Sequence, residues 1–289
     1  MAPHGDRVAG AVVGRRRVTP VERGRALVRI AVLASGGGSN LGALFAHFEQ
    51  PAAAQTAEIA VVLSDKPTAG ALARARERGV AAEVLADHRD GEALVATLAS
   101  HDVQLVVLAG YLKLLPAEVV RAYPGRVLNV HPALLPAFGG HGMYGRHVHT
   151  AVVAAGARIT GVTVHFVDDA YDRGAIIAQW PVPVFPTDTP EDVAARVLRV
   201  EHRLLPLAVQ QVASGAVALG PDGRVRGVVP LAGVGHDDQF VLPRFAAPPA
   251  PSDAPSPSAS VDAHALSAST DAPSPAASSD AGDVSPASA

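Results

Sequence analysis

Apolar runs and amphipathic stretches alternate along the chain between residues 28 and 214. The apolar runs are short and continuous, as expected for strands that are buried on both faces of a sheet. They span residues 28–34, 57–64, 81–85, 103–110, 126–131, 159–167 and 175–179. Helical patterns separate most of them, at residues 40–48, 69–79, 91–101, 117–123 and 149–156. This order predicts an α/β fold with a doubly wound, mostly parallel sheet, Rossmann-like in its layers.

Two further elements follow the predicted sheet. Residues 189–214 read as one long helix, with Thr189 as N-cap, Pro190 at the first position and acidic residues in the first turn. Residues 217–229 then alternate around a Pro-Asp-Gly turn, which predicts a C-terminal hairpin.

The two ends of the chain differ from its middle in composition. Residues 1–27 are Arg-rich and lack strong periodicity, and we expect a flexible leader there. Residues 236–289 are dominated by Ala, Ser, Pro and Asp, with too few large apolar side chains to offset the entropy of ordering. We therefore expect one domain at residues 28–235, followed by a disordered, low-complexity tail.

The charge balance limits the classes of partner. Lys and Arg number 24 against 27 Asp and Glu, a net charge of −3, which gives no footprint for nucleic acid or for an anionic membrane. No apolar run approaches the roughly 20 residues that span a bilayer. The sequence has no Cys, which fits a reducing cytoplasm. These features favour small-molecule partners and a cytoplasmic protein, and they do not distinguish a monomer from a homodimer.

A glycine cluster follows the first predicted strand. Gly36–Gly38 precede Ser39 and Asn40, which we expect to cap the next helix. Glycines let backbone N–H groups approach a ligand closely, and helix N-termini attract anions. The spacing does not fit the dinucleotide fingerprint, because Leu41 occupies its third glycine position, although Asp65 keeps that alternative open. The cluster could also be a tight turn that binds no ligand. The Ser-Asn pair after the glycines favours a loop that binds a terminal monophosphate.

A second polar group ends the fifth predicted strand, in "VLNVHPALLP". Asn129 and His131 lie two residues apart and should project to one face, and Pro132 ends the strand after them. Together with Asp172, in the acidic loop that follows the strand of His165, they suit acyl transfer to an amine. The amide would donate to the oxyanion and the imidazole would move or stabilise charge. The carboxylate would orient the imidazole and hold its pKa up.

The chain has no G-x-S-x-G motif, which favours direct transfer without a covalent intermediate. Histidines also crowd the glycine-rich segment that contains His141, His147 and His149. A metal site there would need a more rigid cage than this loop offers, so we expect no metal and interpret the segment as a mobile lid.

Taken together, five segments resemble the folate-dependent formyltransferases in order and spacing. They are "AVLASGGGSNLGAL", "VVLAGYLKLL", "VLNVHPALLPAFGG", "GVTVHFVDDAYDRGAIIAQ" and "ARVLRVEHRLLPLAV". The Asn-x-His-Pro-x-Leu-Leu-Pro motif is typical of folate formyltransferases and hydrolases, and the Ser-Gly-x-Gly-Ser-Asn loop is typical of the branch that formylates glycinamide ribonucleotide. The resemblance covers roughly residues 28–230. It implies 10-formyltetrahydrofolate as co-substrate and a step of purine (IMP) biosynthesis.

The resemblance also implies roles for individual residues. The catalytic group is Asn129, His131 and Asp172, with a protonated His131. The ribonucleotide and its phosphate would be bound by Gly37, Gly38, Ser39, Asn40 and Glu201. The folate would be bound by Arg89, Leu112, Lys113, Leu114, Leu115, Asn129, Asp168, Asp169 and Asp172; Arg89 also resembles an arginine near the phosphate.

Two departures from the family pattern concern details of binding. The segment from Ala137 to Val152 is longer than the shortest family versions, which leaves the roles of His147 and His149 open. Leu198 stands where some relatives have a polar residue that contacts the ligand.

The sequence disfavours three other functions. A formyltetrahydrofolate hydrolase normally has an N-terminal regulatory domain, for which residues 1–27 are too short. Methionyl-tRNA formyltransferase has a folded basic C-terminal domain, which the tail does not resemble. A nucleotide-binding module without chemistry would not need the amide, imidazole and carboxylate.

Overall fold

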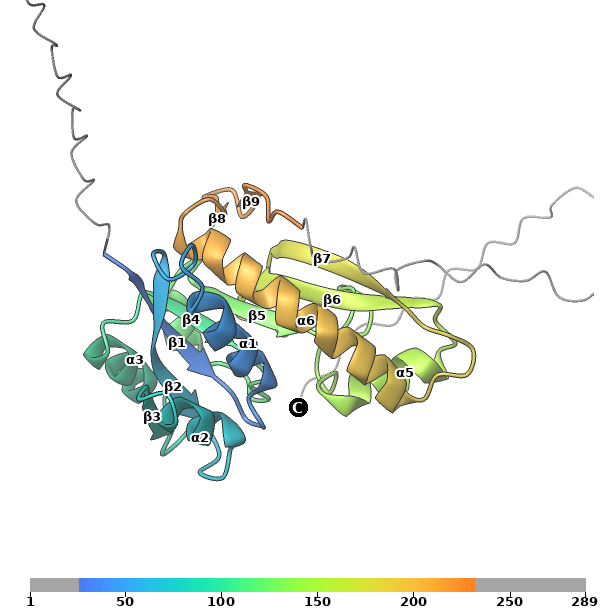
Figure 1. Cartoon of the computed structure of the whole chain (residues 1–289), viewed down its shortest axis with the longest axis horizontal. Helices are drawn as coiled ribbons and strands as arrows, with labels where there is room; N and C mark the ends of the chain where they lie inside the picture. Colours follow the sequence, from blue (N-terminus) through green and yellow to red (C-terminus); the bar gives the residue numbers. More distant parts are fainter. Residues whose placement is uncertain (1–25, 232–289) are drawn as a thin grey trace, which may run out of the picture. The chain divides into compact units, whose positions relative to one another are not determined.

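The computed structural model describes residues 26–231 (Figure 1). The expected tail, and the expected leader apart from its last two residues, lie outside the described residues.

The core of the fold is a seven-stranded sheet with the order β3-β2-β1-β4-β5-β6-β7. The strands are β1 (Val28–Leu33), β2 (Ala57–Ser64), β3 (Ala81–Val84), β4 (Leu105–Leu108), β5 (Val127–His131), β6 (Ile159–Phe166) and β7 (Ile176–Pro183). The pairs from β3 through β5 are parallel, and β6 and β7 are antiparallel to their neighbours. The expected doubly wound, mostly parallel sheet is confirmed.

Helices cover both faces of this sheet. They are α1 (Ser39–Phe48), α2 (Gly70–Arg76), α3 (Gly91–Ser100), α4 (Ala117–Ala122), α5 (Arg146–Ala154) and α6 (Pro190–Ala213). Successive strand residues face opposite sides, so Ile30 and Val32 pack with α1, α2, α5 and α6, whereas Ala31 and Leu33 pack with α3 and α4. The apolar runs of the sequence are continuous because both faces are buried.

The last two elements also follow the sequence pattern. Helix α6 begins with a capping box in which Thr189 accepts from the backbone of Asp192 and Asp192 accepts from that of Thr189. A small hairpin, β8 (Ala218–Leu219) and β9 (Val225–Arg226), ends the described chain. No helix within residues 26–231 has the length and apolarity needed to cross a membrane.

Candidate active site

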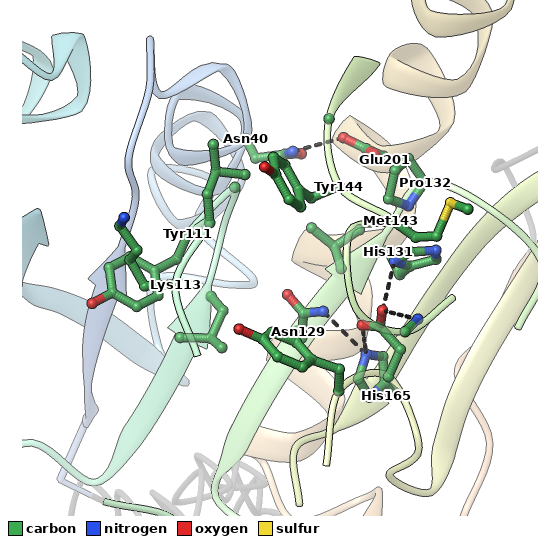
Figure 2. A pocket seen from close by; sticks show the side chains of 18 of the residues that line it. Asn40, Tyr111, Lys113, Asn129, His131, Pro132, Met143, Tyr144, His165 and Glu201 are labelled. Carbon is green, nitrogen blue, oxygen red and sulfur yellow. Dashed lines mark hydrogen bonds and ion pairs between the residues drawn. The ribbon is translucent and has the colours of Figure 1, made fainter. Parts of the chain in front are cut away.

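A cavity of about 500 Å³ opens where strands β4 and β5 end (Figure 2). The segment after β4 forms one wall, and the first turns of α1 and residues of α6 form another. Two loops close it, one between β5 and α5 and one between β6 and β7. This is the region where ligands bind in open α/β sheets.

Strand β5 presents Asn129 and His131 to this cavity, as their two-residue spacing predicts. His131 is 3% exposed, and Asn129 is partly buried. Both side chains are therefore at least partly enclosed by protein where they face the cavity.

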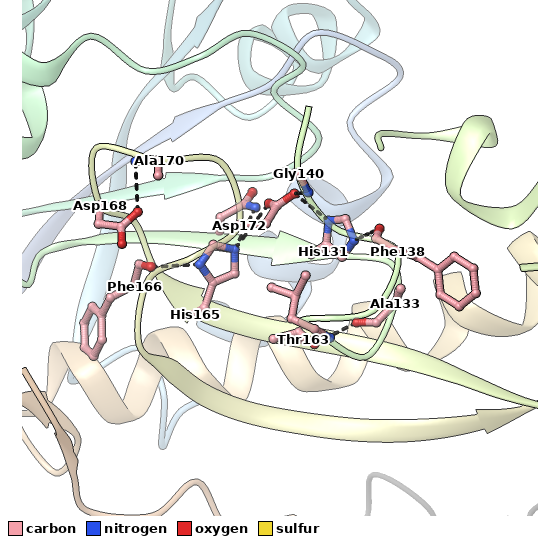
Figure 3. Close-up of polar contacts among 12 residues, drawn as sticks. His131, Ala133, Phe138, Gly140, Thr163, His165, Phe166, Asp168, Ala170 and Asp172 are labelled. Carbon is pink, nitrogen blue, oxygen red and sulfur yellow. Dashed lines mark hydrogen bonds and ion pairs between the residues drawn. The ribbon is translucent and has the colours of Figure 1, made fainter. Parts of the chain in front are cut away.

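Asp172 joins this pair from the loop between β6 and β7. Its Oδ2 lies 3.5 Å from His131 Nδ1 and accepts the backbone N–H of Gly140 at 2.9 Å (Figure 3). The backbone of Asp172 has φ 55°, a left-handed conformation that is uncommon outside glycine. The structure thus brings together the three residues to which the sequence analysis assigns catalysis, and it holds Asp172 in an unusual conformation to do so.

His165, on β6, completes the cluster, although the sequence analysis gave it no role. Its Nδ1 donates to the carbonyl of Phe166 at 2.8 Å (Figure 3). Its Nε2 is therefore free to accept from Asn129 Nδ2 at 3.1 Å (Figure 2). The same Nε2 lies 3.7 Å from Asp172 Oδ1. His165 therefore orients the Asn129 amide. The antiparallel pairing of Asn129 with His165 is what brings the two side chains together.

The Asp172 carboxylate raises the pKa of His131, as expected from the sequence, but the net direction disagrees with the expectation of a protonated His131. Burial lowers the pKa of His131, and this effect outweighs the carboxylate of Asp172 and the carbonyl of Phe138, which both raise it. His131 Nε2 donates to that carbonyl at 2.9 Å, which leaves Nδ1 of the neutral ring facing Asp172. The sequence shows the charged neighbour but not the depth of burial that overrides it.

The glycine loop leads into helix α1, but its capping differs from the expectation. Gly38 is the N-cap, with φ 73°, and no side chain caps the helix. Ser39 and Asn40 are instead the first residues of α1, and both line the cavity. Gly37 and Gly38 are not among the lining residues.

Asn40 links this end of the cavity to α6. Its Nδ2 donates to Glu201 Oε2 at 2.7 Å, and Glu201 is 7% exposed (Figure 2). Burial raises the pKa of the Glu201 carboxyl, and the hydrogen bond from Asn40 opposes that shift. Asn40 Oδ1 is buried with no hydrogen-bond partner among the described residues, so a ligand group could donate to it.

The segment after β4 forms the wall expected from the sequence. Leu112, Lys113, Leu114 and Leu115 all line the cavity, with Leu112 39% and Leu114 48% exposed. Two exposed leucines beside a cavity suit a flat heteroaromatic ring. Tyr111 lines the same wall, although the sequence analysis gave it no role; burial, and next the charge of Asp65, raise its pKa.

The loop between β6 and β7 supplies only part of what was expected. Asp168 and Asp172 line the cavity, whereas Asp169 does not. Arg89 is also outside it: its side chain is 81% exposed and lies 3.6 Å from Asp87. Of the residues assigned to folate binding, Arg89 and Asp169 therefore do not line the cavity.

The histidines of the expected lid occupy three environments. His141 lines the cavity and meets Tyr171 edge-on, and His147 is exposed against Tyr144. His149 is 7% exposed, lines the cavity and has its pKa lowered by burial and by His131. No group of three or more potential metal ligands occurs within residues 26–231.

Two further residues named from the sequence, Leu198 and Asp65, differ in their position relative to the cavity. Leu198 lines the cavity from α6. Asp65, on which the dinucleotide alternative rested, is not among the lining residues.

The fold and the site together define an α/β protein with an amide, two imidazoles and a carboxylate gathered at one cavity. The chain belongs to the formyl transferase family, whose model matches residues 28–209.

Individual proteins of known name are similar over the same region. "Phosphoribosylglycinamide formyltransferase, chloroplastic" of Vigna unguiculata is 41% identical over 68% of this chain and 64% of its own length. "Trifunctional purine biosynthetic protein adenosine-3" of Gallus gallus is 40% identical over 68% of this chain and 20% of its own length. The matched region is thus less than two thirds of each relative.

A solved structure agrees with this similarity. Glycinamide ribonucleotide transformylase 1 from Symbiobacterium toebii is 36% identical with a TM-score of 0.63, over 72% of this chain and the whole of that one (100%). The fold expectation is therefore confirmed by an independent structure as well as by the topology.

Proposed function

We propose that the protein transfers the formyl group of 10-formyltetrahydrofolate to the primary amine of 5'-phosphoribosylglycinamide, within purine (IMP) biosynthesis. The observation that carries this proposal is the convergence of Asn129, His131 and Asp172 at one cavity. The similarity to named glycinamide ribonucleotide transformylases supports the choice of acceptor.

The proposed reaction is a direct acyl transfer. The amine nitrogen bonds to the formyl carbon, the bond from that carbon to folate N10 breaks, and one proton passes from the amine to N10. The Asn129 amide donates to the oxyanion as charge develops there. Its orientation is supported by the hydrogen bond to His165 Nε2.

His131 and Asp172 handle the proton in this scheme. His131 enters the reaction neutral, because burial lowers its pKa, and its Nδ1 faces the carboxylate at 3.5 Å. A proton taken up at Nδ1 would form a charge-assisted hydrogen bond with Asp172, so the pair can hold a proton during transfer.

The two substrates would occupy different ends of the cavity. Ser39, Asn40 and Glu201 would hold the ribonucleotide, with its phosphate near the uncapped N-terminus of α1. Leu112 and Leu114 would contact the folate, opposite the loop that carries Asp168. Metal is not part of the proposed chemistry.

Location and assembly are part of the same proposal. We place the protein in the cytoplasm, supported by the absence of Cys, although the printed name of the Vigna relative says chloroplastic. We propose a monomer or a homodimer that binds these small molecules and neither nucleic acid nor membrane.

The test is a formyl-transfer assay with purified protein and both substrates. Tetrahydrofolate is followed by absorbance and the formylated nucleotide by mass spectrometry, with a control that omits the nucleotide. Tetrahydrofolate release that requires the nucleotide is the expected result. Release without the nucleotide would replace the proposal with formyltetrahydrofolate hydrolysis, and no release in either mixture would leave only a nucleotide-binding role.

A further inference from the structure

Helix α2 fixes the backbone of the glycine loop before α1. The N–H of Ala71 donates to the carbonyl of Gly36 at 3.1 Å, and Arg74 Nε donates to the carbonyl of Gly37 at 2.8 Å. Two successive loop carbonyls are thereby turned toward α2. Neither donor stands out in the sequence, because an arginine on a short helix usually lies on a solvated face.

The contact between α2 and the loop is a close backbone packing. A Cβ on Gly70 would lie 3.2 Å from Gly37 Cα and O, and a Cβ on Gly38 would lie 2.7 Å from Ala71 Cα. Neither glycine can gain a side chain without moving its neighbour. The backbone of α2 therefore packs directly against the backbone of the loop.

Arg74 also carries a charge to this place. Its Nη1 lies 3.7 Å from the Cβ position of Gly42, in the first turn of α1. Within residues 26–231 no carboxylate pairs with Arg74, and Arg74 does not line the cavity. A cation beside the positive end of a helix is unfavourable until an anion binds there.

From these contacts we propose that Arg74 is a positioning residue for the substrate phosphate. Its Nε holds the Gly37 carbonyl away from the ligand, and its charge adds to the positive potential at the α1 N-terminus. Arg74 acts through the loop and need not touch the substrate. This inference rests on the proposed function, since it assigns the phosphate of the ribonucleotide to that loop.

The test compares Arg74→Ala, Arg74→Lys and Arg74→Gln with Arg76→Ala. Arg76 lies two residues further along α2, on roughly the opposite side of the helix, and is also exposed. Removing Arg76 deletes the same charge from the same helix but leaves the loop contact intact. Thermal unfolding of each variant shows whether the fold is retained.

Steady-state kinetics distinguish a specific effect on nucleotide binding from a general loss of active enzyme. In Arg74→Ala we expect the KM for 5'-phosphoribosylglycinamide to rise about three- to tenfold, as for the loss of one hydrogen bond. The kcat and the KM for 10-formyltetrahydrofolate should stay within about twofold. Arg76→Ala should match the wild type. Arg74→Lys should have a lower nucleotide KM than Arg74→Gln, because only Lys keeps the charge; a KM no lower than that of Arg74→Gln would overturn the role of the charge.

An unchanged nucleotide KM in Arg74→Ala would overturn the inference, as would an equal rise in Arg76→Ala. If the wild type transfers no formyl group, the role of Arg74 is tested separately. Ribose 5-phosphate is then titrated by calorimetry into the wild type, Arg74→Ala and Arg76→Ala. Weaker binding of ribose 5-phosphate to Arg74→Ala than to Arg76→Ala would support the role of Arg74 in phosphate binding, even though the proposed function had failed. Equal binding, or none to the wild type, would overturn it.

Discussion

A carboxylate between two imidazoles defines the chemistry of the site at the scale of single residues. His131 and His165 each donate one ring N–H to a backbone carbonyl, and the other ring nitrogen of each lies within 3.7 Å of Asp172. Both nitrogens facing the carboxylate lack a proton when the rings are neutral. A proton added to either of these nitrogens would therefore face the Asp172 carboxylate and form a charge-assisted hydrogen bond with it.

His165→Ala tests whether this second imidazole matters. The variant removes the acceptor that orients Asn129 Nδ2, so we expect kcat to fall about tenfold to a hundredfold. The KM for the nucleotide should stay within about twofold. Steady-state kinetics with both substrates measures the two parameters.

His147→Ala is the matched control, because His147 is an exposed histidine near the site that does not line the cavity. It should keep the wild-type kcat. A His165→Ala enzyme that folds and retains full kcat would show that Asn129 needs no orientation from β6.

Sequence reasoning found three of the four polar residues that meet at the cavity, for physical reasons that differ by residue. Asn129 and His131 follow from strand alternation, and Asp172 was included through a family resemblance as well as its acidic loop. His165 reads as a core histidine, because nothing local shows that β6 pairs it with Asn129. Arg89 was assigned by motif although its side chain is exposed, away from the cavity.

Pairing between elements decides what the site can contain. The connection between β6 and β7 has no helix, and β6 is antiparallel to β5, so the acidic loop returns over the sheet toward His131. The apolar runs predict the strands, but a buried run has no feature that reports its direction. The element order was thus accessible from the sequence, and the orientation of β6 was not.

The turn from β1 to α1 offers a prediction at this scale. Gly38→Ala places a side chain at φ 73° and within 2.7 Å of Ala71 Cα, so we expect the free energy of unfolding to fall by about 1–3 kcal/mol. The nucleotide KM should rise together with this loss. Urea denaturation and kinetics measure the two effects.

Gly36→Ala controls for a methyl group in the same loop. A Cβ on Gly36 meets nothing within 4 Å, and its φ is not in the left-handed range. The free energy of unfolding should change by no more than about 0.5 kcal/mol. Equal losses in the two variants would mean that the loop is sensitive to any substituent.

The link between α1 and α6 offers another prediction. Glu201→Gln keeps an oxygen that can accept from Asn40 and removes a buried carboxyl whose pKa is raised by burial. We expect thermal stability to be unchanged or higher, and the nucleotide KM to rise about tenfold through loss of a charged acceptor.

Glu201→Ala provides the comparison for the Gln variant. It leaves the Asn40 amide unpaired in a buried place, so its thermal unfolding temperature should be lower than that of Glu201→Gln. A Gln variant as unstable as the Ala variant would contradict this account of the pair.

Buried histidines set the response of the whole molecule to acid. Burial lowers the pKa of several of them, so their folded pKa values lie below the unfolded value of about 6.5. They are His131, His149, His165 and His202. As pH falls below about 6.5, the unfolded chain takes up protons that the folded chain does not, and the free energy of unfolding decreases.

Glu201 acts in the opposite direction, because a raised folded pKa favours the folded state on acidification. Asp188 has its pKa lowered by Arg196, so its contribution to the free energy of unfolding is lost only as pH falls below the ordinary Asp value of 3.8. With several histidines against one glutamate, we expect a lower urea midpoint at pH 5.5 than at pH 7.5. An equal or higher midpoint at pH 5.5 would contradict this balance.

The loop that carries Asp172 is closed at its base by a hydrogen bond from the N–H of Phe166 to the carbonyl of Ala175. Gly174 has no room for a side chain there, because a Cβ would meet the Phe166 carbonyl. Residues 168–173 thus form a short loop on a closed base, and Asp172 ties the loop to the histidines beside the cavity. Under the proposed function, exchanging residues 168–171 between relatives, with Asp172 and Gly174 retained, would change the side chains beside the cavity and leave the strands of the sheet as they are.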